Sequence, residues 1–265
     1  MGPHFEALYK QYNRIEYIDP DPLLPVRQFP DARDQEVVGL IASSLAFGNV
    51  KQILNSIAVV LERLPNPRED VLRMPPHALG RQFRQFRHRY VTGTELTGLL
   101  TGVRRVLREW DTLGDCFAQC VKPDDETLLP AMSRFTAELR KGSKLEKNYL
   151  LPDPAKGSAC KRLLMYLRWM VRDDAVDLGL WRNVSPAKLI VPMDTHMHRM
   201  SRRLGITQRK SADMRAALEV TRAFRQVAPD DPVRYDFALT RLGIRGDTDL
   251  EAFVAACASR TPCEF

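Results

Sequence analysis

Cysteine is scarce in this chain, and its spacing fits neither a disulfide framework nor a metal site. Five of the 265 residues are cysteines, an odd number without the C-x-x-C pairs of zinc sites or the four-cysteine pattern of iron–sulfur clusters. Cys116 and Cys120 are one helical turn apart, which favours a shared buried face over a pair of metal ligands. We therefore expect no metal, no iron–sulfur cluster and no other cofactor.

Long apolar runs and common enzyme motifs are also missing. No run approaches the roughly 20 apolar residues of a transmembrane helix, and no signal-peptide core is present, so we expect a cytoplasmic chain that does not bind a membrane. No P-loop, GxGxxG, HExxH or G-x-S-x-G motif occurs. A metal site built from aspartates is a weaker alternative, because these residues fall in turns, where aspartate is common. They are Asp19, Asp21, Asp173, Asp174 and Asp177.

The charge balance is moderately basic. The chain has 40 lysines and arginines against 33 acidic residues, a net charge of +7 and a pI near 9.3, which favours a polyanionic partner. Two basic clusters stand out, and the second directly follows Asp194; each is also compatible with an ordinary solvated helix face. The clusters are Arg81, Arg84, Arg87, His88 and Arg89, and Arg199, Arg202, Arg203, Arg209, Lys210 and Arg215.

Apolar residues follow helical periodicity through most of the chain, whereas strand signals are sparse. Residues 53–64 have the spacing of an amphipathic helix, which Asn49 is placed to cap. A buried helix over 34–47 precedes it and ends at Gly48. Prolines at 20, 22 and 25 predict an extended N-terminal arm. Further helices are expected near 69–74, 95–109, 112–121, 126–140, 160–172, 195–204, 211–227, 232–242 and 248–258.

These patterns predict an all-α fold. We expect residues 1–265 to form a single unit of two helical lobes with a cleft between them. The break between the lobes is expected near residues 145–160, and the N-terminal arm, residues 1–30, is expected to pack on the C-terminal lobe.

Two segments carry the residues with the clearest chemical potential. Lys161 stands at the start of an apolar helix, and Asp194 stands between an apolar stretch and a basic helix. A lysine amine can attack a sugar carbon to form a Schiff base, and a nearby carboxylate can activate it and offset positive charge. Asp194 taken alone is more simply an N-cap, but a cap can also be catalytic, because the helix N-terminus keeps a carboxylate ionised.

The helix that begins at Lys161 has large apolar groups on two faces. At 100° per residue, Met165 and Trp169 lie on the stripe of Lys161, opposite the core face. They predict a flat apolar wall beside the amine, suited to an extruded base. The alternative is that another element covers this face, which would make both residues part of a second core.

Three separated places resemble the helix-hairpin-helix DNA glycosylase superfamily. Val191-Pro192-Met193-Asp194-Thr195-His196-Met197 looks like its catalytic-aspartate segment, most closely that of the 8-oxoguanine branch. Residues 40–49 are similar to its early helix and base-pocket loop, and residues 231–239 fall where the closing pocket helix would be. The usual Leu-Pro-Gly-Val-Gly hairpin is missing, and residues 152–158 stand in its place. The 33-residue gap from Lys161 to Asp194 resembles that of the archaeal 8-oxoguanine glycosylases.

The resemblance implies a modified helix-hairpin-helix and a monomeric base excision repair enzyme of the nucleoid, a glycosylase with AP lyase activity on damaged double-stranded DNA. It also implies that 8-oxoguanine is the lesion. The alternatives are a glycosylase for a different base, a non-catalytic DNA-binding protein of the same fold, and a helical interaction module that binds no nucleic acid. The implied catalytic residues are Lys161 and Asp194; the base-pocket candidates are Phe47, Asn49, Met165, Trp169 and Asp236; the DNA-binding candidates are Lys51, Gly157, Ser158, His196, Arg199 and Arg203.

Overall fold

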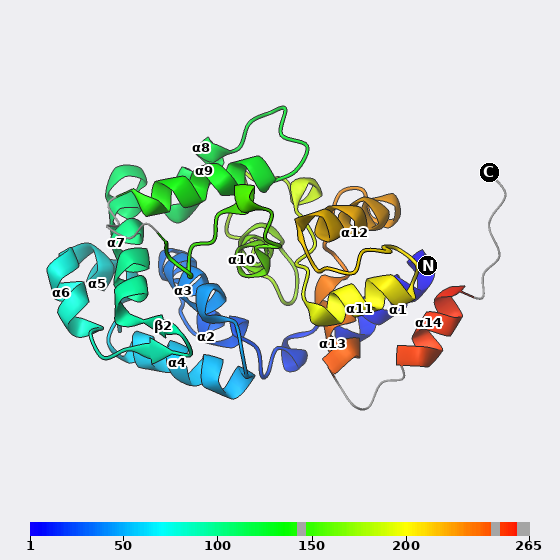
Figure 1. Cartoon of the computed structure of the whole chain (residues 1–265), viewed down its shortest axis with the longest axis horizontal. Helices are drawn as coiled ribbons and strands as arrows, with labels where there is room; N and C mark the ends of the chain where they lie inside the picture. The colour runs from blue at the N-terminus through cyan, green and yellow to red at the C-terminus, as the bar shows by residue number, and fades with distance from the viewer. Residues whose placement is uncertain (142–146, 245–249, 259–265) are drawn as a thin grey trace.

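The computed structural model describes residues 1–141, 147–244 and 250–258, and this part of the chain is predominantly helical (Figure 1). The expected all-α class is confirmed, with one short hairpin of strands added. The elements up to the hairpin are α1 (Gly2–Tyr12), η1 (Ile15–Tyr17), α2 (Leu23–Arg27), α3 (Ala32–Leu45), α4 (Val50–Glu62), α5 (Pro67–Arg73), α6 (Pro76–Gln82), β1 (Arg87–His88) and β2 (Val91–Thr92). The later elements are α7 (Gly93–Trp110), α8 (Leu113–Cys120), α9 (Leu129–Arg140), η2 (Pro154–Lys156), α10 (Lys161–Val171), η3 (Pro186–Lys188), α11 (Thr195–Arg203), α12 (Met214–Val227), α13 (Asp236–Ile244) and α14 (Leu250–Ala258).

Most helices lie where periodicity predicts them, and their first residues follow local capping signals. The Asn49 side chain caps α4 as expected, by accepting a hydrogen bond from the Lys51 amide at 2.9 Å. Thr92 and Glu95 form a capping box at the start of α7. The expected extended arm is only partly correct, because residues 23–27 form the short helix α2. Pro25 is tolerated there because a first-turn N–H has no partner within the helix.

The helices α3 and α10 form the central pair of the fold. Gly39 brings them close together, since a Cβ at this position would lie 2.9 Å from Met170 Cε and 3.2 Å from the Tyr166 ring. The Tyr166 hydroxyl also donates a hydrogen bond to the Glu36 carbonyl oxygen at 3.1 Å. At the Lys161 end of α10, the Arg162 guanidinium donates to the Ser44 carbonyl oxygen in the last turn of α3.

Buried ion pairs tie α10 to distant segments. The Arg168 guanidinium contacts Asp177 and Asp236, and Arg172 contacts Asp177 and Asp231. Burial alone would lower the pKa of Arg168, but these carboxylates outweigh that effect and raise it. Removing one partner of such a buried pair costs about 3–5 kcal/mol, so the network holds α10 firmly in place.

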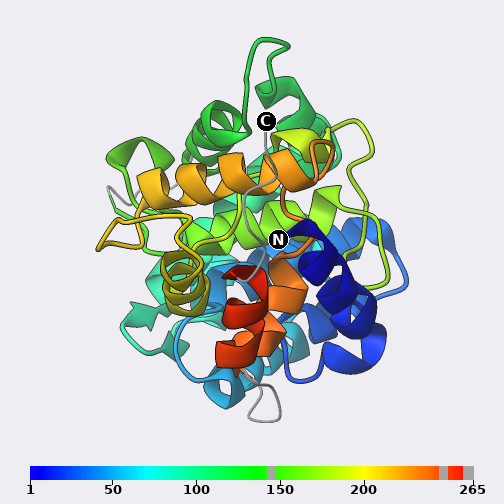
Figure 2. The ribbon, with the colours of Figure 1, turned by 90° about the vertical axis from the view of Figure 1, so that its right-hand side faces the viewer.

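The two ends of the described chain lie close together (Figure 2). The Phe5 ring of α1 contacts Phe224 of α12 and Tyr235 just before α13, with centroids 5.3 and 5.4 Å away. An ion pair between Glu6 and Arg234 adds to this contact. From α1 the chain continues to residues 19–22, which reach the site described below. Among the described helices, none is both long and apolar enough to cross a membrane.

Candidate active site

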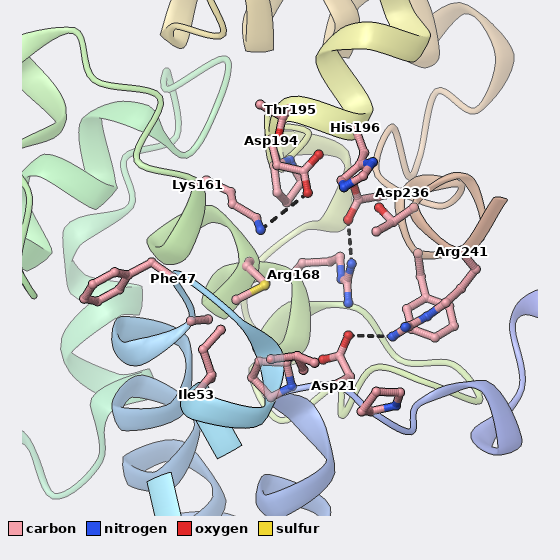
Figure 3. A pocket seen from close by; sticks show the side chains of 18 of the residues that line it. Asp21, Phe47, Ile53, Lys161, Arg168, Asp194, Thr195, His196, Asp236 and Arg241 are labelled. Carbon is pink, nitrogen blue, oxygen red and sulfur yellow. Dashed lines mark hydrogen bonds and ion pairs between the residues drawn. The ribbon is translucent and has the colours of Figure 1, made fainter. Parts of the chain in front are cut away.

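Lys161 and Asp194 point toward each other from the first turns of α10 and α11 (Figure 3). The Lys161 Nζ lies 3.4 Å from the Asp194 Oδ2, and the two side chains are 36% and 18% exposed. The other carboxylate oxygen, Oδ1, accepts a hydrogen bond from the Met197 amide at 2.8 Å. Asp194 is thus the predicted N-cap, and its second oxygen remains directed at the amine.

Local backbone geometry sets the direction of both side chains. Cys160 adopts a left-handed conformation with φ of 45°, so the chain turns sharply just before Lys161 begins α10. On the other side, the Val191 amide donates to the Thr221 hydroxyl of α12 at 3.0 Å, which anchors the extended segment that leads to Asp194. Asp194 itself is extended, as an N-cap residue normally is.

The pair opens into a cavity of about 510 Å³, the size expected for a small-molecule site. Its apolar wall includes Phe47 from the loop after α3, Ile53 from α4 and Met165 from α10. Two of the predicted base-pocket residues, Phe47 and Met165, thus line the same cavity as Lys161. His196 and Asp236 also line the cavity.

The far end of the cavity is polar, with two ion pairs in its wall (Figure 3). Arg168 pairs with Asp236, and Arg241 of α13 lies 2.6 Å from Asp21 of the N-terminal segment. Burial raises the pKa of the Asp236 carboxyl, and the Arg168 charge opposes that rise. Asp236, another predicted base-pocket residue, thus lines the cavity with its carboxylate already paired with Arg168.

Two predicted base-pocket residues are wrong. Trp169 is fully buried and does not line the cavity. The alternative of a second core is correct for this residue, because every residue of α10 from Leu163 to Val171 is buried. Asn49 is exposed, lies outside the cavity wall, and uses its side-chain oxygen to cap α4.

Of the predicted DNA-binding residues, His196 lines the cavity, whereas Lys51, Gly157, Ser158, Arg199 and Arg203 lie outside its wall. Lys51 and Arg199 are exposed, and Arg199 donates to His196 Nδ1 at 3.2 Å. Arg203 is held 2.5 Å from Glu251 of α14, which offsets its charge.

The turn before α10 agrees only in part with the predicted phosphate contacts. Ser158 is exposed in a shallow hollow beside Lys161. The Gly157 amide already donates to the Pro154 carbonyl oxygen at 3.3 Å, so a phosphate contact would have to replace that bond.

Sequence reasoning missed Asp21, Arg168 and Arg241 as residues of the site. Arg168 had a signal, because it falls on the same helical stripe as Met165. Asp21 and Arg241 are 220 residues apart, and no local pattern connects them. Within the described residues, no group of three or more histidine, cysteine, aspartate or glutamate side chains is arranged to hold a metal ion.

The family model described as "Protein of unknown function (DUF2400)" matches residues 21–245. The chain belongs to the DUF2400 family. No curated protein and no solved structure matches the chain. The DUF2400 match spans Lys161, Asp194 and the ion-paired residues at the polar end of the cavity, from Asp21 to Arg241.

Proposed function

We propose that this DUF2400 chain is a DNA glycosylase with AP lyase activity, built as two helical lobes with a cleft between them. The observation that carries the proposal is the Lys161–Asp194 pair, 3.4 Å apart in the wall of a cavity. An amine beside a carboxylate supplies the nucleophile and the charge-stabilising group that a Schiff-base mechanism needs.

The first step exchanges one bond at the sugar carbon C1′. The neutral Lys161 amine donates its electron pair to C1′, and the bond from C1′ to the base breaks, so that the base leaves with that electron pair. Asp194 Oδ2 is close enough to Nζ to accept the proton that the ammonium must lose. Asp194 then passes that proton on to solvent water, and the ionised carboxylate offsets the positive charge that develops on the sugar.

The second step cuts the strand. The attached nitrogen loses one proton and uses its electron pair to form the C1′=N bond of a protonated Schiff base, while the ring oxygen leaves C1′ with the bonding pair and takes up that proton. Loss of a proton from C2′ then drives cleavage of the C3′–oxygen bond, and the phosphate leaves with its electron pair. Water finally hydrolyses the Schiff base and regenerates the amine.

The cavity supports the entry of a single extruded base. Glycosylases reach a stacked base by rotating its nucleotide out of the duplex. Phe47, Ile53 and Met165 offer apolar contact, and the ion pairs of the far end offer donors and acceptors for the polar edge of a base.

The arrangement of helices supports the two-lobed part of the proposal. In Figure 1, α3 to α9 gather on one side of α10, and α11 to α14 together with α1 gather on the other. The cavity draws residues from both groups, among them Ile53 from the first and Asp236 from the second.

Binding to DNA is expected to weaken steeply with salt. Each neutralised phosphate contributes about −0.9 to the slope of log affinity against log salt on duplex DNA. Arg199→Ala should flatten this slope by about that amount. Arg203→Ala should flatten it less, because Glu251 already offsets the Arg203 charge. The measurement is fluorescence anisotropy over a salt series.

A suitable control is Arg33→Ala, because Arg33 pairs with Asp111 at the end of α3 remote from the cavity. This variant should keep the parent slope. A parent slope near zero would remove DNA from the partners and favour a helical interaction module.

The lesion is expected to be 8-oxoguanine. It differs from guanine by a few hydrogen-bonding atoms, and a site that pairs those atoms discriminates strongly. The ion pairs Arg168–Asp236 and Asp21–Arg241 place such groups in the cavity wall. A panel of single-lesion duplexes should show release of 8-oxoguanine, with a guanine duplex left intact.

The panel also separates the alternatives. Cleavage of oxidised-pyrimidine or uracil duplexes with 8-oxoguanine untouched would refute the lesion but keep the enzyme class. Salt-dependent binding without cleavage of any duplex would instead indicate a non-catalytic DNA-binding protein.

A further inference from the structure

Two neighbouring tyrosines beside Phe47 are unusually exposed. Tyr90 is 58% exposed and Tyr149 is 57% exposed, although both rings are large and partly apolar. Their ring centroids lie 5.3 Å apart in an edge-to-face arrangement. The two residues come from different segments, Tyr90 from the turn between β1 and β2 and Tyr149 from the segment before η2.

The aromatic rings continue from this surface to the cavity wall. The Tyr90 ring lies 5.2 Å from the Phe47 ring with an angle of only 30° between their planes. Phe47 in turn lines the cavity that contains Lys161. A row of three rings thus leads from the site to solvent.

The hairpin that carries Tyr90 is fixed in place, beside α4 (Figure 1). His88 of β1 anchors the hairpin, because its ring bonds to the Ser56 hydroxyl at 2.9 Å and to the Phe47 carbonyl oxygen at 3.1 Å. Burial lowers the pKa of His88, which favours the neutral ring, and a neutral ring can donate from one nitrogen and accept at the other.

The backbone on both sides of Tyr149 is also anchored. Its neighbours Asn148 and Leu150 are buried, and the Asn148 side chain donates to the Glu95 carbonyl oxygen at 2.9 Å. The Arg162 guanidinium donates to the Tyr149 carbonyl oxygen. Because the backbone of Tyr149 is already anchored, its exposed ring loses little further conformational freedom when it binds a partner.

Positive charge accompanies the rings. The Arg162 guanidinium lies 4.9 Å from the Phe47 ring centroid. The Arg89 side chain runs directly along Gly48, since a Cβ there would lie 2.7 Å from an Arg89 nitrogen. Aromatic faces beside arginines suit nucleobases, which have an aromatic face and carry phosphates next to them.

We propose that Tyr90 and Tyr149 form a stacking surface for an unpaired base of the DNA, next to the nucleotide that enters the cavity. The proposal rests on the function proposed above, because a base becomes unpaired beside the site when its neighbour or partner is extruded. Stacking on such rings is tolerant of sequence, since every base has an aromatic face. The surface would therefore favour DNA with an unpaired region over continuous duplex.

The test compares an undamaged single-stranded oligonucleotide with a duplex of the same sequence, using the full chain. Tyr90→Ala combined with Tyr149→Ala should raise the dissociation constant for the single strand by about tenfold or more. Tyr90→Phe combined with Tyr149→Phe retains the rings and should stay within about twofold of the parent. Ile15→Ala, at a residue that is 61% exposed and outside the cavity wall, should bind as the parent does.

A second readout follows the base itself by its fluorescence. A single strand that contains 2-aminopurine should lose fluorescence when it binds the parent protein, because stacking quenches this base. The Phe pair should retain the quenching and the Ala pair should lose it. Unchanged affinity and quenching in the Ala pair, or no binding of the single strand by the parent, would overturn the proposal.

Borohydride trapping on DNA with an abasic site, measured on the same proteins, separates the two proposals. Tyrosine-dependent binding without any trapped adduct would support the stacking surface and refute the lyase. Trapping by the parent with no effect of the tyrosines on single-strand binding would refute only the stacking surface.

Discussion

Lys161→Gln is expected to abolish the covalent adduct that borohydride traps between this protein and DNA with an abasic site. Nζ is the only atom of the Lys161 side chain that can form the Schiff base. Glutamine has a similar length but no nucleophilic nitrogen. Strand cleavage should disappear together with the adduct. The measurement is gel electrophoresis of the trapped complex.

The variant should still fold and bind DNA. The Lys161 side chain is 36% exposed and its ion pair with Asp194 is open to the cavity. A partly exposed pair of this kind contributes only about 0–1 kcal/mol, so its loss costs little stability. Affinity for undamaged duplex should therefore stay close to that of the parent.

Lys156→Gln is the matched control. Lys156 lies five residues before Lys161, is exposed, and does not line the cavity. The Lys156→Gln variant should form as much of the borohydride-trapped adduct as the parent does. An adduct that survives Lys161→Gln would mean that another amine reacts, and the role assigned to Lys161 would be wrong.

Local signals in the sequence were sufficient for most of the fold. The caps at Asn49 and Asp194 depend on the side chain and the amides two or three residues later, and both were predicted correctly. The short helix α6 was missed because its proline pair reads as a break. Pro76 instead occupies the first turn of the helix, where proline is well tolerated.

The errors at the site come from contacts that no local pattern contains. The stripe of Lys161 was interpreted as an open wall of the site, yet Arg168 and Arg172 on the same side of α10 are buried against Asp236 and Asp231, which lie far along the chain. This burial places Trp169 in the core rather than in the cavity. The Asp21–Arg241 pair could not be predicted from the sequence either, because only the fold brings the two residues together.

Asp194→Asn is expected to lower base release by orders of magnitude with almost no change in stability. The two oxygens of Asp194 have separate partners: Oδ1 accepts from the Met197 amide, and Oδ2 faces Lys161 Nζ. Asparagine can retain the capping oxygen, so the helix should lose no more than about 1 kcal/mol. It replaces the second oxygen by a neutral amide group, which neither accepts a proton from the ammonium nor offsets charge on the sugar.

Three measurements test this separation. Thermal unfolding should give a midpoint near that of the parent for Asp194→Asn, whereas Asp194→Ala, which loses the cap, should unfold earlier. Single-turnover kinetics should show slow base release for both variants. Asp31→Asn changes an exposed cap of α3 in the same way, but away from the cavity, and should release the base at the parent rate.

The outcome for Asp194→Asn decides what the carboxylate does. Near-normal turnover would reduce Asp194 to a helix cap and remove half of the proposed catalytic pair. Slow turnover with an early unfolding midpoint would trace the defect to the helix instead. Slow turnover in a stably folded protein is the result expected here, because only the oxygen that faces Lys161 has then lost its charge.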